Sequence, residues 1–311
     1  MSVDLRMQVG TLSLTSPILT ASGTFGYARE FEGLTDLSRL GGIATKGISP
    51  RPRFGNPSPR ICETASGMLN SIGLENVGVE GFANEKLPFL AKLGTRIVVN
   101  FFGETFDEYV DCAAGLTAAA RRHGGGIDAL EMNISCPNIK KGGVEFGTDP
   151  KVAGDLVRAC RAATDLPLWV KLTPNVADLV TLARAVVEAG ADCLSIINTI
   201  TAMGVNARTR RPRLATTFGG LSGPAIKPVA LRMVHQVARA GLGVPICGIG
   251  GIASGEDVAE FLVAGATCVQ VGTMNFVDPD AANRVRDELE AFCMAEGLAC
   301  AAELVGTLRP C

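Results

Sequence analysis

Short apolar runs rich in β-branched residues alternate along the chain with longer amphipathic segments. Eight such runs have the length and composition of buried strands, at residues 16–22, 41–49, 96–103, 129–136, 167–173, 193–200, 244–252 and 268–274. The intervening segments repeat apolar residues at helical spacing, as where Val152, Leu156 and Cys160 recur every four residues. Regular alternation of strands and helices is typical of a parallel sheet.

Eight repeats of a strand followed by a helix predict a closed (β/α)₈ TIM barrel, and an open doubly wound sheet is the alternative. Residues 4–17 precede the first repeat and predict a β-hairpin that turns at 9–11 and plugs the barrel floor. No linker or composition shift divides the chain, so we expect one domain spanning residues 1–311.

Three connections differ from ordinary loops of a barrel. Residues 50–78 and 201–223 are too long for such loops, and both follow predicted strands. We therefore expect both at the C-terminal mouth, where barrel active sites are built. The segment 138–149 is polar and rich in glycine, which is the character of a lid.

Composition narrows the classes of function. The net charge of −2 over 311 residues gives no reason to expect nucleic acid or an anionic membrane as a partner. Neither a signal peptide nor an apolar run of about 18 residues is present, so a cytoplasmic location is expected. None of the ten cysteines has the spacing of a zinc or iron–sulfur site, and most are expected to be reduced thiols in the core.

Polar residues occupy strand positions where a purely structural barrel would carry Val or Ile. All of them lie in the C-terminal halves of predicted strands, within reach of the mouth: Lys46, Asn100, Asn133, Lys171 and Asn198. One such residue alone is most often a satisfied structural group. Two buried lysines, however, require an anionic or polar partner. Together the five residues predict a flat, polar, anionic ligand above the barrel.

Glycines after the last two strands predict a phosphate site. They are Gly250 and Gly251 after the seventh strand, and Gly272, followed by Thr273, after the eighth. Glycine backbone N–H groups that no side chain covers bind anions, and barrels commonly hold phosphate at this place. The helix after the eighth strand is expected to begin only near Pro279. Gly248, Gly250 and Ala253 also match a dinucleotide fingerprint, but they open no βαβ unit, so an NAD site is disfavoured.

Cys136 is the cysteine that the strand pattern places at the mouth. It lies three residues beyond Asn133, and Pro137 ends the strand because it has no N–H. A thiol there can act as a base once a cationic or polar site lowers its pKa. The alternative is that Cys136 packs a tight turn, and the residues alone leave both interpretations open. His123 and His235 lack metal-ligand spacing, so we predict no metal site.

Over essentially its whole length the chain resembles the class 1 dihydroorotate dehydrogenases. The resemblance is carried by ASGTFGY (21–27), TKGIS (45–49), GMLNSIGLEN (67–76), VNFFG (99–103), EMNISCPN (131–138), VKLTPN (170–175), INT (197–199), GGLSGPAIKP (219–228), GIGGI (248–252) and VGT (271–273). GMLNSIGLEN and NISCPNIKKGG are most similar to the two-subunit, NAD-linked class 1B, and less to the single-subunit, fumarate-linked class.

The resemblance implies an FMN-binding barrel that oxidises (S)-dihydroorotate to orotate in de novo pyrimidine (UMP) biosynthesis. Cys136 would take the proton from C5, and the hydride from C6 would pass to flavin N5. FMN would be held by Ser22, Lys46, Gly47, Asn100, Asn133, Lys171, Ile197, Gly223, Gly250, Gly251, Gly272 and Thr273. Dihydroorotate would contact Lys46, Asn70, Ser71, Ile72, Gly73, Leu74, Asn133, Asn198 and Thr199.

Class 1B also implies a partner. Electrons would pass from FMN to a subunit that carries FAD and a [2Fe–2S] cluster, and then to NAD; two copies of each subunit would form a heterotetramer around a homodimer core. The alternatives are a fumarate-dependent homodimeric dihydroorotate dehydrogenase, a flavin barrel that acts on free pyrimidine bases, and a non-catalytic barrel that binds flavin or phosphate.

Overall fold

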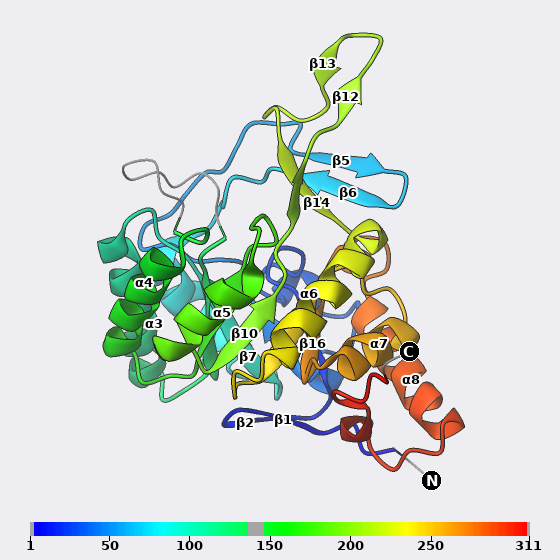
Figure 1. The fold of residues 1–311 in the computed structure, drawn as a ribbon. Coiled ribbons are helices and arrows are strands. Elements are labelled where there is room, and N and C mark those ends of the chain that lie inside the picture. The colour runs from blue at the N-terminus through cyan, green and yellow to red at the C-terminus, as the bar shows by residue number, and fades with distance from the viewer. Residues whose placement is uncertain (1–2, 136–145, 310–311) are drawn as a thin grey trace.

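Eight parallel strands close into a barrel in the computed structural model, which describes residues 3–135 and 146–309 (Figure 1). Around the barrel the order is β10-β15-β16-β3-β4-β7-β8-β9. The strands are β3 (Ile18–Thr20), β4 (Gly42–Ala44), β7 (Arg96–Phe101), β8 (Ala129–Asn133), β9 (Leu168–Leu172), β10 (Cys193–Ile196), β15 (Ile246–Ile249) and β16 (Cys268–Val271). Each predicted run contains one of them, so the TIM-barrel prediction is confirmed and the open sheet is wrong.

Helices surround this barrel. The long ones are α3 (Phe106–Arg122), α4 (Pro150–Ala163), α5 (Leu179–Glu188), α6 (Lys227–Arg239), α7 (Gly255–Ala264) and α8 (Ala281–Ala295). Shorter helical elements are η1 (Arg29–Phe31), η2 (Leu37–Arg39), α1 (Gly78–Gly81), η3 (Phe82–Lys86), α2 (Leu87–Leu90), η4 (Pro224–Ile226), η5 (Thr273–Phe276) and η6 (Ala301–Leu304). No helix in the described ranges combines the length and the apolar character that crossing a bilayer would need.

The N-terminal hairpin closes one end of the barrel, as predicted. Strands β1 (Met7–Val9) and β2 (Leu12–Leu14) pair antiparallel, and Gly10 in the turn has a φ of 58°, which favours glycine. Val9, Leu12 and Leu14 are buried in one apolar cluster with residues of the barrel interior such as Trp169. The hairpin therefore plugs the barrel floor, seen below the barrel in Figure 1.

The two long connections meet at the opposite end, and their pairing was not predicted. Strands β5 (Ile61–Thr64) and β6 (Gly67–Asn70) come from one, while β11 (Ile200–Ala202) and β14 (Gly219–Ser222) come from the other. They form one antiparallel sheet in the order β11-β14-β6-β5. A ribbon of β12 (Val205–Asn206) and β13 (Arg211–Pro212) extends beyond it, away from the barrel (Figure 1).

Side chains fill the barrel interior in two layers of different chemistry, because alternate residues of a strand point inward. The floor layer is apolar and consists of Val98, Ala129, Trp169, Cys193, Cys247 and Cys268. The polar layer lies nearer the mouth and consists of Asn100, Glu131, Lys171, Ser195 and Gln270, all of them buried. On each of five strands a polar-layer residue follows a floor-layer residue by two positions. The site is built on this polar layer.

Candidate active site at the barrel mouth

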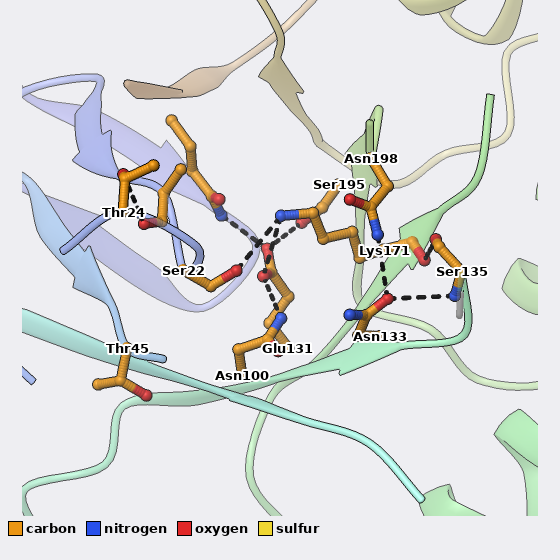
Figure 2. Close-up of polar contacts among 12 residues, drawn as sticks. Ser22, Thr24, Thr45, Asn100, Glu131, Asn133, Ser135, Lys171, Ser195 and Asn198 are labelled. Atoms are coloured by element: carbon orange, nitrogen blue, oxygen red, sulfur yellow. Dashed lines mark hydrogen bonds and ion pairs between the residues drawn. The ribbon is translucent and has the colours of Figure 1, made fainter. Parts of the chain in front are cut away.

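Glu131 forms the centre of the polar layer and has no exposed surface. Its Oε1 accepts hydrogen bonds from Ser195 Oγ at 2.7 Å and Gln270 Nε2 at 2.6 Å. Its Oε2 accepts one from Asn100 Nδ2 at 2.7 Å, and Lys171 Nζ lies 3.8 Å from the same oxygen (Figure 2). Five strands that are distant in sequence are thus joined at one carboxyl group.

Sequence reasoning missed three members of this network, namely Glu131, Ser195 and Gln270. A signal was present, because strand residues two positions apart share a face. Glu131 precedes Asn133 by two positions, so it had to point into the barrel like Asn133. Ser195 follows Cys193, and Gln270 follows Cys268, by two positions, so each shares a strand face with a floor cysteine. Their convergence on Glu131, however, depends on how the strands are arranged around the barrel.

Lys171 carries its charge from the polar layer toward the mouth. Its side chain is buried, and its Nζ donates to Ser22 Oγ at 3.4 Å in addition to the 3.8 Å contact with Glu131. An ammonium group has three N–H donors, and neither of these contacts is short. Lys171 therefore keeps donor capacity for a ligand, and Ser22, which the resemblance assigns to the same cofactor, lies next to it.

Asn133 and Asn198 meet at the end of β8. Asn133 Oδ1 accepts from Asn198 Nδ2 at 3.3 Å and from the Ser135 amide at 3.1 Å, whereas Asn133 Nδ2 has no acceptor within residues 3–135 and 146–309 (Figure 2). Ser135 Oγ donates to the Lys171 carbonyl at 2.9 Å. The chain is thus held in place directly before Cys136. Cys136 and most of the predicted lid, residues 138–145, lie outside the described residues.

The predicted positions of Lys46 and Asn198 within strands are wrong in detail. Asn100, Asn133 and Lys171 do belong to strands, but Lys46 and Asn198 each lie two residues beyond a strand end. The reason at Lys46 is that its N–H turns to the carbonyl of Gly26, away from the barrel ladder. Both side chains still lie at the mouth. Lys46 Nζ has no hydrogen-bond partner in the part of the chain that the structure describes.

Gly47 leaves room for the Asn100 side chain. A Cβ at position 47 would lie 2.8 Å from Asn100 Oδ1 and 3.3 Å from the Phe102 ring. The absence of a side chain therefore allows the backbone to approach the amide that also donates to Glu131. This close approach places Gly47 directly beside Asn100, and their role in one cofactor site stays a prediction.

Backbone N–H groups without acceptors gather after β15 and β16. Those of Gly250, Gly251, Gly272 and Thr273 donate to no group in the described ranges. A Cβ at Gly272 would meet only Ala21 Cβ, at 3.5 Å, so this backbone faces open space. Helix α8 begins at Ala281, as expected, and the 3₁₀ turn η5 fills the interval. Free N–H groups in this arrangement suit a phosphate.

The backbone N–H groups at the N-terminus of α7 already have hydrogen-bond acceptors within the chain. Asp257 Oδ2 accepts from the amides of Ala253 and Ser254, and Ser254 Oγ accepts from Asp257 N in a capping box. An anion at this mouth would therefore be held by the glycine amides and not by the first turn of the helix.

The predicted substrate residues fall into two groups. Asn70 Nδ2 donates to the Gly220 carbonyl at 3.3 Å, and a Cβ at Gly220 would lie 2.1 Å from Thr199 Oγ1, so Asn70 and Thr199 converge on the same backbone. The loop of Ser71, Ile72, Gly73 and Leu74 instead bonds with residues 56–60 and Asn76. No described contact joins this loop to Lys171 or Asn133, and its role stays a prediction.

Ile197 and Gly223 frame the site through their backbones. The Ile197 amide donates to the Ile249 carbonyl at 3.0 Å, beside the glycines that follow β15. Gly223 has a φ of 94°, and a Cβ there would lie 2.7 Å from the Gly67 Cα. Thr273 Oγ1 donates to Ser222 Oγ at 2.8 Å, which ties the β14 sheet to the phosphate side of the mouth.

The floor cysteines have a different environment. Burial raises the pKa of Cys193 and Cys247 well above the ordinary thiol value, and it also raises the pKa of Cys268. Their thiols are therefore held in the protonated, unreactive form. Within the described residues no group of three or more His, Cys, Asp or Glu side chains could hold a metal ion.

Comparison with known proteins finds relatives over nearly the whole chain. The sequence model of a family described as dihydroorotate dehydrogenase matches residues 4–293. The chain is 53% identical over 309 residues to the "Dihydroorotate dehydrogenase B (NAD(+)), catalytic subunit" of Pelobacter propionicus, covering 99% of this chain and 100% of that protein. The protein of the same name from Geobacter sulfurreducens is 52% identical over 306 residues, covering 98% of each chain.

Proposed function

The chain belongs to the dihydroorotate dehydrogenase family, and we propose that it oxidises (S)-dihydroorotate to orotate in de novo pyrimidine synthesis as the catalytic subunit of an NAD-linked enzyme. The observation that carries the proposal is the mouth of the barrel. It combines a buried lysine, asparagine amides with free donors and unpaired backbone amides in one place. The names of the relatives support the NAD-linked class.

The residues present fit FMN as the cofactor. The free N–H groups after β15 and β16 match a phosphate. Lys171, Asn100 and Ser22 offer donors for the carbonyl and ring-nitrogen acceptors of an isoalloxazine, and Gly47 leaves room beside Asn100. FMN, when bound, would supply the hydride acceptor.

The chain's own residues would bind the substrate and move its proton. Lys46 and the amides of Asn70, Asn133 and Asn198 would hold the carboxylate and the ring polar atoms of dihydroorotate. Cys136 would accept the C5 proton as a thiolate. Loss of that proton and of the C6 hydride leaves the C5=C6 double bond of orotate, so one proton and two electrons leave the ring as a hydride and one proton goes to sulfur.

The proposal includes a partner. The relatives are named as catalytic subunits, which supports a separate subunit that carries electrons onward. That subunit would hold FAD and a [2Fe–2S] cluster and reduce NAD, in a complex of two plus two around a homodimer of this chain. A cytoplasmic location completes the proposal.

An anaerobic absorbance experiment tests the cofactor and the substrate together. The purified chain is expected to show the bands of an oxidised flavin, and added (S)-dihydroorotate is expected to bleach the visible band. Dihydrouracil serves as the control because it can give the same hydride but lacks the carboxylate. A flavin that dihydroorotate does not bleach, or that dihydrouracil bleaches faster, would contradict the proposed substrate.

Steady-state assays then test the NAD-linked class. The isolated chain is expected to turn over slowly with fumarate, and NAD reduction is expected only when the partner subunit is present. Rapid turnover of the isolated chain with fumarate would instead support the fumarate-dependent homodimer.

A further inference from the structure

Glu131 is a buried acid to which the proposed chemistry gives no task. Every side chain that contacts its oxygens presents an N–H or O–H group: Ser195 and Gln270 to Oε1, Asn100 and Lys171 to Oε2. Of these groups only the Ser195 hydroxyl could accept from a protonated carboxyl group, since the other three meet it with N–H donors. The donor set therefore suits the carboxylate, which can accept at both oxygens.

Glu131 and Lys171 are also each other's counter-charge. Their side chains are 0% and 7% exposed, and neither forms another ion pair in the part of the chain that the structure describes. Charges removed from water need a partner of opposite sign, since an unpaired one is costly. Glu131 thus balances the cation that the proposed cofactor site uses.

We propose that Glu131 is a positioning residue that holds Lys171 and Asn100 at the proposed flavin site and, through its charge, lowers the reduction potential of the bound FMN. The inference rests on the proposed function. A negative charge near the flavin opposes the addition of electrons, and it offsets part of the stabilisation that Lys171 offers to a reduced, anionic flavin. The same carboxylate orients the Asn100 amide through the 2.7 Å hydrogen bond.

The substitution Glu131→Gln tests this inference because it keeps the shape of the side chain and removes the charge. The potential of the bound FMN is measured by reductive titration against a reference dye, without dihydroorotate. We expect a rise that increases the ratio of reduced to oxidised flavin about tenfold at a given potential, about 30 mV for a two-electron couple. An unchanged or lowered potential would overturn the inference.

Ser195→Ala is the matched control. It removes one hydrogen bond to the same carboxylate, at 2.7 Å, and leaves the charge in place. We expect the flavin potential of this variant to stay at the wild-type value even if the protein is less stable. A rise equal to that of Glu131→Gln would show that general disturbance of the network moves the potential, and it would overturn the role of the charge.

A second measurement covers the case in which Glu131→Gln does not fold. Lys171→Met leaves the carboxylate buried without its cation, and adding Glu131→Gln removes that unpaired charge. By urea denaturation of the chain without added flavin, the double variant is expected to have an unfolding constant about tenfold smaller than Lys171→Met alone. A double variant that is less stable than Lys171→Met would refute the pairing.

Failure of this inference differs from failure of the proposed function. Absence of flavin from the purified wild-type chain, and no binding of added FMN, would reject the cofactor and with it the inference. Flavin bound with equal potential in the wild type and Glu131→Gln would reject the inference alone and leave the proposed function standing.

Discussion

The floor layer and the polar layer of the barrel occupy the same strands two residues apart, yet their chemistry is opposite. On β9 the buried Trp169 is followed two positions later by Lys171, and on β8 Ala129 is followed by Glu131. The floor is sealed by the hairpin and holds its thiols protonated, while the polar layer joins four strands by hydrogen bonds and a fifth by an ion pair, and faces the mouth. The apolar layer that packs the barrel and the polar layer that forms the candidate site are therefore only two residues apart along each strand.

The largest expected difference between the two layers is in the rate of flavin reduction after a cysteine is replaced. Cys136→Ala should slow flavin reduction by dihydroorotate about 10²–10⁴-fold near neutral pH, because the general base is lost. Cys247→Ala, in the floor layer, should leave that rate unchanged and reduce only stability. Anaerobic stopped-flow absorbance measures both. Near-normal reduction in the Cys136 variant would mean that this cysteine packs a turn and is not the base.

A smaller effect, on stability alone, is expected at the floor. Trp169 is 1% exposed, and Trp169→Ala should lower the free energy of unfolding by about 3–5 kcal/mol, because it leaves a cavity among the hairpin and strand residues. The measurement is urea denaturation monitored by circular dichroism. The folded fraction should still bind FMN with the wild-type spectrum; a displaced flavin spectrum would show that the two layers are coupled.

The least disruptive comparison uses the reactivity of native thiols. Burial raises the pKa of Cys193 and Cys247, so the thiolate fraction of these groups stays low as the pH rises from 7 to about 9. Iodoacetamide should therefore label the partly exposed Cys62 and Cys300 before the floor cysteines, which should stay unlabelled until the chain unfolds. Peptide mass spectrometry as a function of pH gives the result. Equal labelling of Cys193 and Cys62 in the folded chain would contradict a sealed floor.

Much of the fold and part of the candidate site could be predicted because their signals are local. Each barrel strand lies in a short, mainly apolar run, Gly10 marks the hairpin turn, and Gly250 and Gly272 directly follow strands. The pairing of β6 with β14 could not be predicted, because the two strands are separated by about half the chain and carry no complementary pattern. The same limit hid Gln270, which reaches Glu131 across 139 residues of sequence.

The sequence by itself determined the alternation of strands and helices, the hairpin and the polar positions near strand ends, because hydrophobic period and backbone freedom are properties of neighbouring residues. Only the tertiary structure decided which polar groups meet. Closure of the barrel brings Asn100, Lys171, Ser195 and Gln270 within reach of the one carboxyl group of Glu131. A buried charge is tolerated only where such partners converge, and convergence depends on strand order and register.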